Sequence, residues 1–152
     1  MMESAPTGRP THMMSFTDAV QNVLMNNFAN WDGRASRSEY WWFILFYVIV
    51  GAIAEAIDRI VFGSDATDPA AIQMSISLIA GLALFFPTLC VTVRRLHDLG
   101  KSGWWLFIIL IPLLGVIVFL VFMATEGEQL SNQYGDVPTN TLEQGGNIHT
   151  NY

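Results

Sequence analysis

The stretch YWWFILFYVIVGAIA, Tyr40–Ala54, contains no charged side chain. A helix needs about 20 mostly apolar residues to cross the hydrocarbon core of a bilayer, which is about 30 Å thick. Apolar residues extend this run as far as Phe62, although Glu55, Asp58 and Arg59 interrupt its last part. We therefore expect a first membrane span over about 40–62.

Two further apolar segments follow, and we expect spans over about 72–93 and 104–124. The last segment has no charged residue but contains Pro112 and Gly115. These two residues leave an alternative open, in which the third segment turns back within the membrane as a re-entrant hairpin. The sequence thus predicts an all-α membrane protein with a membrane domain over 32–124 and three transmembrane helices.

The composition also favours a membrane protein. Of the 152 residues, 52% are hydrophobic and only 13% are charged, against about 25% charged residues in soluble domains. The net charge of −6, without a run of Lys or Arg, argues against nucleic-acid binding, which depends on neutralising phosphates. The bilayer is therefore the expected partner. The single cysteine, Cys90, lies in an apolar segment and is expected to be a small core residue.

Polar segments flank the apolar region. Residues 1–14 are expected to be a disordered lead, and 125–152 a polar, mostly disordered tail. In 15–31, SFTDAVQNVLMNNFANW, apolar residues recur every three or four positions, and Ser15 is placed to cap the first turn with Asp18 three residues on. We expect an amphipathic helix there, lying in the membrane interface before the first span.

The basic residues are distributed unevenly and predict the orientation. With three spans, six of them fall on one side and only Arg59 on the other: Arg9, Arg34, Arg37, Arg94, Arg95 and Lys101. Cytoplasmic segments near spans carry the excess of Lys and Arg. We therefore expect a multi-pass protein of the bacterial inner membrane with a cytoplasmic N-terminus and with the first loop and the C-terminal tail outside.

Two basic stretches enter the membrane in a similar way. These are GRASRSEYWW, 33–42, and RRLHDLGKSGWW, 94–105. In the first, Ser36 and Glu39 fit a capping box that starts a helix at Arg37; in the second, Gly100 is suited to end a helix. Their aromatic residues are expected to anchor the spans at the headgroup level: Tyr40, Trp41, Trp42, Trp104 and Trp105.

Together with IPLLG, 111–115, and NQYG, 132–135, these motifs resemble a bacterial inner-membrane family catalogued as domain of unknown function 805. The resemblance covers roughly 16–138. It implies a small polytopic inner-membrane protein and no assigned reaction.

The charged residues of the two basic stretches are expected to form one cluster on the cytoplasmic face, because charges next to hydrocarbon are costly unless they are paired. We expect the pairs Arg37–Asp98 and Glu39–Arg94. Such a cluster is either a structural clasp that joins the spans or a site for an anionic lipid headgroup or another phosphate. Its candidate residues are Arg34, Arg37, Glu39, Arg94, Arg95, His97, Asp98 and Lys101.

The expected function is that of a non-enzymatic membrane module acting through helix packing and this face, as a homo-oligomer or within a larger membrane complex. No Ser-His-Asp set is apparent, and His97 with Asp98 offers too few ligands for zinc, so neither a metal nor a cofactor is expected. The alternative is a small oligomeric transporter or channel that uses Glu55 and Asp58.

Overall fold

The computed structural model describes residues 13–63 and 75–138. The predictions for the lead up to residue 12, for the loop 64–74 and for the end of the tail, 139–152, lie outside these residues. The regular secondary structure of the described part is helical, apart from an isolated bridge between Asn132 and Gly135. Its elements are α1 (Phe16–Gln21), the π-helical turn η1 (Asn22–Asn26), α2 (Arg37–Phe62), α4 (Ile76–Asp98), the 3-10 helix η2 (Gly103–Leu110) and α5 (Leu114–Ala124).

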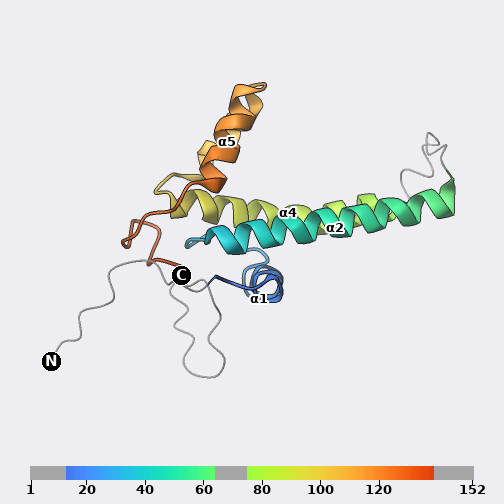
Figure 1. Cartoon of the computed structure of the whole chain (residues 1–152), viewed down its shortest axis with the longest axis horizontal. Coiled ribbons are helices and arrows are strands. Elements are labelled where there is room, and N and C mark those ends of the chain that lie inside the picture. The colour runs from blue at the N-terminus through green and yellow to red at the C-terminus, as the bar shows by residue number, and fades with distance from the viewer. Residues whose placement is uncertain (1–12, 64–74, 139–152) are drawn as a thin grey trace.

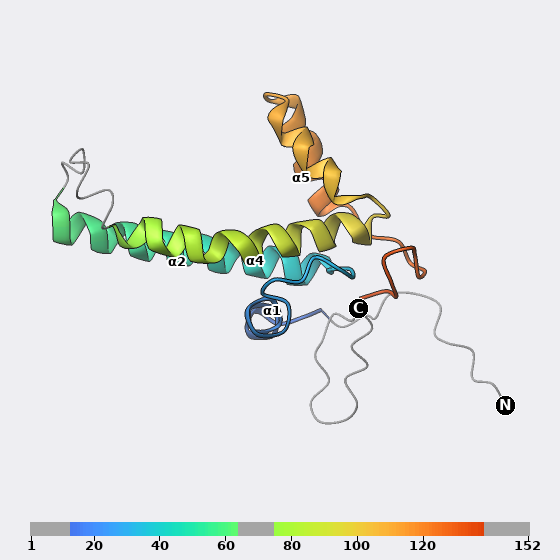
Figure 2. The same cartoon turned by 180° about the vertical axis from the view of Figure 1, so that it is seen from behind.

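Helices α2 and α4 run side by side over most of their length (Figures 1 and 2). The start of α2 is as predicted, because the side chain of Ser36 accepts a hydrogen bond from the amide of Glu39. Helix α4 continues past the predicted end of the span at 93 and stops at Asp98, close to Gly100, where the helix was expected to end and whose φ is 68°. Among the described residues, α4 is the one helix long and apolar enough, by length and composition, to cross a membrane.

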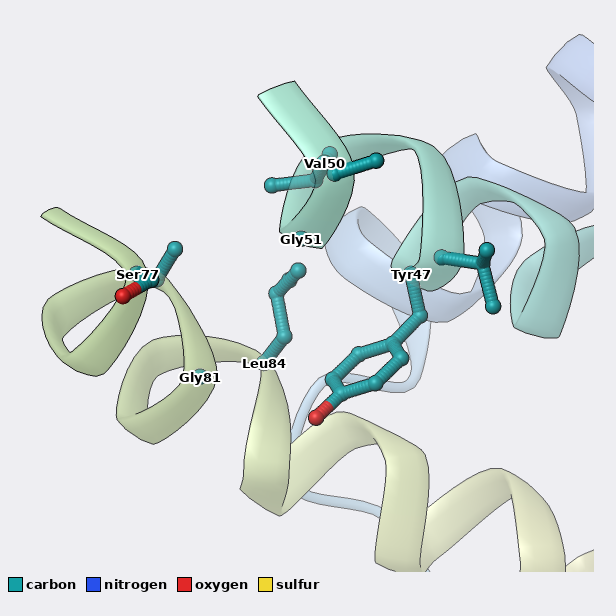
Figure 3. Close-up of a pocket in the computed structure, with 9 residues that line it drawn as sticks. Tyr47, Val50, Gly51, Ser77, Gly81 and Leu84 are labelled. Carbon is teal, nitrogen blue, oxygen red and sulfur yellow. The ribbon is translucent and has the colours of Figure 1, made fainter. Parts of the chain in front are cut away.

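The middle of the α2–α4 pair is less tightly packed than the sequence suggests. Ser77 and Gly81 are one helical turn apart, a spacing that predicts close approach of two helices. Instead, a hollow of about 140 Å³ lies between the helices, and Figure 3 shows Tyr47 and Leu84 extending toward it from opposite sides. A Cβ atom added to Gly51 or Gly81 would meet nothing within 4 Å. The small residues here line open space.

The third apolar segment is not one helix. It forms η2, turns at Ile111–Leu113 and returns as α5, so the structure does not confirm a third straight span. The break occurs where the sequence has Pro112, whose ring opposes a continuous helix. Figures 1 and 2 show this hairpin projecting away from the α2–α4 pair, with both of its ends near the last turn of α4. The segment after α5 therefore lies beside the two basic stretches and not at the opposite end, where it was expected.

The amphipathic segment is shorter than predicted. Helix α1 begins with the expected cap, in which the Ser15 side chain accepts from the amide of Asp18. Helical structure ends at Asn26, and the side chains of Asn27 and Asn30 bond to nearby acceptors in their own segment. Such local hydrogen bonds compete with a helix. The segment crosses α2 and does not run along it (Figure 1).

The hydrophobic core lies at one end of the α2–α4 pair. It combines residues from η1, α2, α4 and α5, and includes Val23, Phe43, Val91, Leu96 and Met123. Both basic stretches reach this end, so their charged side chains lie next to the best-packed part of the molecule.

Candidate functional site: a buried arginine cluster

A sharp turn before α2 brings the first basic stretch against the second. Gly33 has a φ of 84°, in the left-handed region that glycine adopts without strain. The chain then runs extended beside the last turn of α4, where the amide of Ala35 donates to the carbonyl of Arg94 at 3.0 Å. This contact places Arg34 next to α4. We use the name arginine cluster for the buried ionic residues that meet here: Arg34, Glu39, Arg94, Arg95 and Asp98.

Asp98 is the centre of the arginine cluster. Its Oδ1 accepts from Nε of Arg34 at 3.0 Å, and its Oδ2 accepts from Nη1 of Arg95. All three side chains are fully buried. The predicted Arg37–Asp98 pair is wrong, because Arg37 already belongs to α2 whereas Arg34 lies in the segment beside α4. Arg37 instead faces Glu126 at 3.8 Å, and both side chains are about half exposed.

The second predicted pair is confirmed. Nη2 of Arg94 lies 2.5 Å from Oε1 of Glu39, and both side chains are almost fully buried. The same carboxylate oxygen accepts from the side-chain amide of Asn22 at 3.1 Å, which ties η1 to the pair. Nε of Arg94 is the one buried side-chain polar atom of the described residues that lacks a hydrogen bond.

Backbone carbonyls at the end of α5 and in the segment after it complete the arginine cluster. Arg34 donates through Nη1 to the carbonyl of Leu130 at 2.8 Å and through Nη2 to that of Glu128 at 2.5 Å. Arg95 donates to the carbonyls of Met123 and Thr125. Three guanidinium groups therefore share two carboxylates, and carbonyl oxygens take up donors that the carboxylates do not reach. Hydrogen bonds of this kind are what makes buried charge tolerable.

His97 lies beside the arginine cluster and is held from both sides. Its Nδ1 is 3.2 Å from the carbonyl of Gly33, and its ring stacks on that of Tyr134 with 3.8 Å between centroids. The side-chain amide of Asn132 donates to the His97 carbonyl at 2.9 Å. Sequence reasoning noticed the NQYG motif that holds Asn132 and Tyr134 but placed it on the opposite side of the membrane, and so missed these contacts.

The remaining candidate of the cluster, Lys101, lies apart from it. Its Nζ is 5.0 Å from the ring centroid of Trp105 in η2 and 4.8 Å from that of Phe122 in α5. A cation over an aromatic face is attracted to it, so Lys101 joins the two arms of the hairpin at their base.

Four of the five predicted aromatic anchors are exposed, as lipid contact requires: Trp41, Trp42, Trp104 and Trp105. Tyr40 is the exception. It is 5% exposed and belongs to the core, so its prediction as an interfacial anchor is wrong. Its position on α2 turns it toward α4 rather than outward, and its ring contacts that of Trp41 at 5.3 Å.

The acidic residues at the far end of α2 have structural partners. Both oxygens of Asp58 accept backbone amides at the start of α4, from Ile76 at 2.7 Å and Ser77 at 2.9 Å. A carboxylate at this position satisfies amides that lack a partner within the helix and complements its dipole. Glu55 pairs with Arg59 one turn along the surface of α2, at 3.1 Å.

Within residues 13–63 and 75–138, no group of three or more His, Cys, Asp or Glu side chains could hold a metal ion. The arginine forks are directed at groups of the same chain. What the arrangement does is join α2, α4 and the segment after the hairpin.

Comparison with known proteins identifies the family. Residues 28–136 match the family model described as Protein of unknown function (DUF805). The chain is 39% identical over 115 residues to the inner membrane protein YhaI of Escherichia coli strain K12, which covers 76% of this chain and 91% of YhaI. It is 32% identical over 115 residues to the inner membrane protein YhaH of the same strain, covering 76% of this chain and 92% of YhaH. No solved structure matches. The arginine cluster, His97 and the NQYG motif all lie within the matched residues, and the chain belongs to the DUF805 family.

Proposed function

We propose that this protein is a non-enzymatic module of the bacterial inner membrane in which α2 and α4 cross the bilayer as an antiparallel pair. The relatives YhaI and YhaH are inner membrane proteins. At 1.5 Å per residue, α2 with 26 residues and α4 with 23 are about 39 and 35 Å long, enough for a hydrocarbon core of about 30 Å. Many large apolar side chains of both helices are exposed, among them Val48, Ile53, Ile79 and Leu82.

The arginine cluster would then lie at the cytoplasmic end. Arg34, Arg37, Arg94 and Arg95 are all at this end of the helix pair, whereas Arg59 is at the other, and cytoplasmic ends of spans carry the excess of basic residues. The segment 125–138 lies on the same side, since Arg34 and Arg95 bond to its carbonyls. With this orientation, the segment 125–138 would lie at the cytoplasmic face, on the same side as Arg34.

The observation that carries the proposal is the burial of the arginine cluster with its guanidinium groups already bonded inside the chain. It favours a structural clasp over a headgroup site, because a lipid phosphate needs guanidinium donors that can reach it. The clasp holds the exposed tryptophans and the hairpin in fixed positions, and these would be the surfaces that a second copy or a larger membrane complex contacts.

A charge exchange between Glu39 and Arg94 tests the clasp. Glu39→Arg and Arg94→Glu should each lower the thermal unfolding midpoint of the purified protein in detergent, and the double variant should recover much of the loss, because an isolated buried charge is costly and a reversed pair is not. The exposed pair Glu55 and Arg59 is the matched control, in which the same exchanges should change little.

The headgroup alternative makes the opposite prediction. Single variants that fold normally but lose co-purified anionic lipid, with no recovery in the double variant, would contradict the clasp. The channel alternative receives no support from the far end of the helices, since the carboxylate of Asp58 is engaged by two backbone amides and Glu55 by Arg59.

A further inference from the structure

The hairpin formed by η2 and α5 has an apolar surface on all sides. No charged residue occurs between Trp104 and Ala124. Both arms expose large apolar side chains, including Trp104, which is 78% exposed, and Leu113 at the tip, which is 82% exposed. An apolar surface of this extent is not left in water. It also lacks the polar face of a helix that lies flat in the membrane interface.

Both ends of the hairpin are fixed at the same end of α4. Arg95 holds the end of α5 through the carbonyls of Met123 and Thr125. Lys101 lies over one ring from each arm. The amide of Glu128, beyond α5, donates to the carbonyl of Asp98 at 2.9 Å. A segment held in this way enters and leaves the bilayer through one surface.

The length of the arms matches one leaflet. The eight residues of η2 at a rise of about 2.0 Å, and the eleven of α5 at 1.5 Å, each span about 16 Å. The hydrocarbon core is about 30 Å thick. The tip would therefore reach the middle of the bilayer and stop there.

The backbone groups of the tip are largely hydrogen-bonded within the tip, as hydrocarbon requires, because an unpaired backbone group is costly there. Leu113 has φ 61° and ψ −64°, the strained form of a γ-turn, and the amide of Leu114 donates to the carbonyl of Pro112 at 2.7 Å. The amides of Ile111 and Gly115 also bond within the tip. Gly115 permits the close approach of the arms, because an added Cβ would overlap the carbonyl oxygen of Ile108.

The angle between the hairpin and α4 leaves an apolar groove. It has a volume of about 700 Å³ and lies between Phe86 and Leu89 of α4, Trp104 and Phe107 of η2, and Trp31. The groove opens onto the exposed apolar surface of α4, which includes Leu82 and Phe85. Its lining is almost entirely apolar, which suits a hydrocarbon chain better than a polar ligand.

We propose that the hairpin inserts into the cytoplasmic leaflet alone, with lipid acyl chains as its partner and an acyl chain in the groove beside α4. The leaflet assignment rests on the orientation given under the proposed function. The return of the segment rests on the hairpin contacts and is independent of that orientation. A third full span would be a different path of this segment, and a second copy of the chain would be a different occupant of the hairpin's surface.

Cysteine accessibility tests the return. In the full chain carrying Cys90→Ser, single cysteines are introduced by Ser102→Cys and Ser131→Cys, before and after the hairpin. A membrane-impermeant maleimide should label both in inverted vesicles and neither in intact spheroplasts. Labelling of position 131 alone from outside would overturn the hairpin. Labelling of both positions from outside would overturn the proposed orientation and the leaflet named here, while the return of the segment would stand.

Lipid contact is tested separately with a fluorescent bimane attached through Leu114→Cys in proteoliposomes that contain lipids brominated along the acyl chains. Leu114 is 62% exposed near the tip, so brominated lipid should quench its fluorescence several-fold more than that of the same label at Ser131→Cys. Equal, weak quenching at both positions would mean that protein and not lipid covers the hairpin, and would overturn the proposal.

Discussion

The two ends of the α2–α4 pair are held together by different means. At the arginine end, five buried ionic side chains and the hydrophobic core join four helical elements. At the far end, Ile60 and Val61 are exposed and the polar tie is Asp58 at the start of α4, while a hollow separates the helices in the middle of the pair. One end is thus specified by directional contacts within the chain. The far end depends more on the length and hydrophobicity of the two helices and on the medium around them.

The largest effect is expected at Asp98. Asp98→Asn would leave Arg34 and Arg95 buried without their carboxylate, and removing one partner of a buried ion pair typically costs about 3–5 kcal/mol. The free energy of unfolding in detergent, measured by chemical denaturation, should fall by about that amount, and the yield of folded protein should fall with it. Glu55→Gln, which removes one partner of an exposed pair, serves as the control, and its free energy of unfolding should stay close to that of the original protein. Equal stability of the two variants would show that the Asp98 carboxylate is not buried.

A smaller loss is expected at the hairpin tip. Gly115→Ala places a methyl group against the Ile108 carbonyl, and overpacking of this kind costs about 1–3 kcal/mol. The same denaturation measurement should show the loss, and limited proteolysis should cut the 103–124 segment sooner. Leu113→Gly should act in the opposite direction, because glycine adopts the positive φ at this position without strain. A loss of stability in Leu113→Gly would contradict the strained turn.

The effect at Asp58 should remain local. Asp58→Asn weakens the acceptors of the Ile76 and Ser77 amides, so the first turn of α4 should fray while the arginine end is unaffected. Hydrogen exchange should accelerate at these two amides and remain unchanged at the amides of Val91 and Leu96. Faster exchange throughout α4 would show instead that the two ends are coupled and do not unfold independently.

The smallest expected effect has the opposite sign. Gly81→Ala adds a methyl group toward open space and removes the conformational freedom of glycine, which should stabilise α4 by about 0.5–1 kcal/mol. A modest rise in the unfolding midpoint would confirm that the hollow is open. A fall would mean that α2 and α4 approach each other here more closely than the hollow between them implies.

The sequence was sufficient for features that depend on local chemistry. The run of apolar residues predicts α2, Ser36 with Glu39 predicts its start, and Gly100 predicts the end of α4, because hydropathy, capping and a left-handed glycine act within a few residues. The Glu39–Arg94 pair also followed, from the cost of leaving charges unpaired near hydrocarbon.

Features that depend on contacts distant in sequence were harder to predict. The choice of Arg34 over Arg37 as the partner of Asp98 depends on how the chain turns at Gly33 and runs beside α4. Pro112 and Gly115 suggested a break in the third segment, but the direction of its return is determined by Arg95 and Lys101, which hold the two ends of the hairpin. Hydropathy alone does not distinguish a hairpin from a span.

The bonds from Arg34 and Arg95 to the end of α5 and the segment after it are accepted by main-chain oxygens, those of Met123, Thr125, Glu128 and Leu130 among them. Every amino acid supplies a main-chain oxygen, so these bonds do not depend on which side chains the segment carries. During evolution, substitutions at a position that contributes its carbonyl alone, such as Leu130, should accumulate freely as long as the path of the chain is kept, whereas the insertion or deletion of a single residue would shift every acceptor at once. At such positions selection would preserve the number of residues more than their identity.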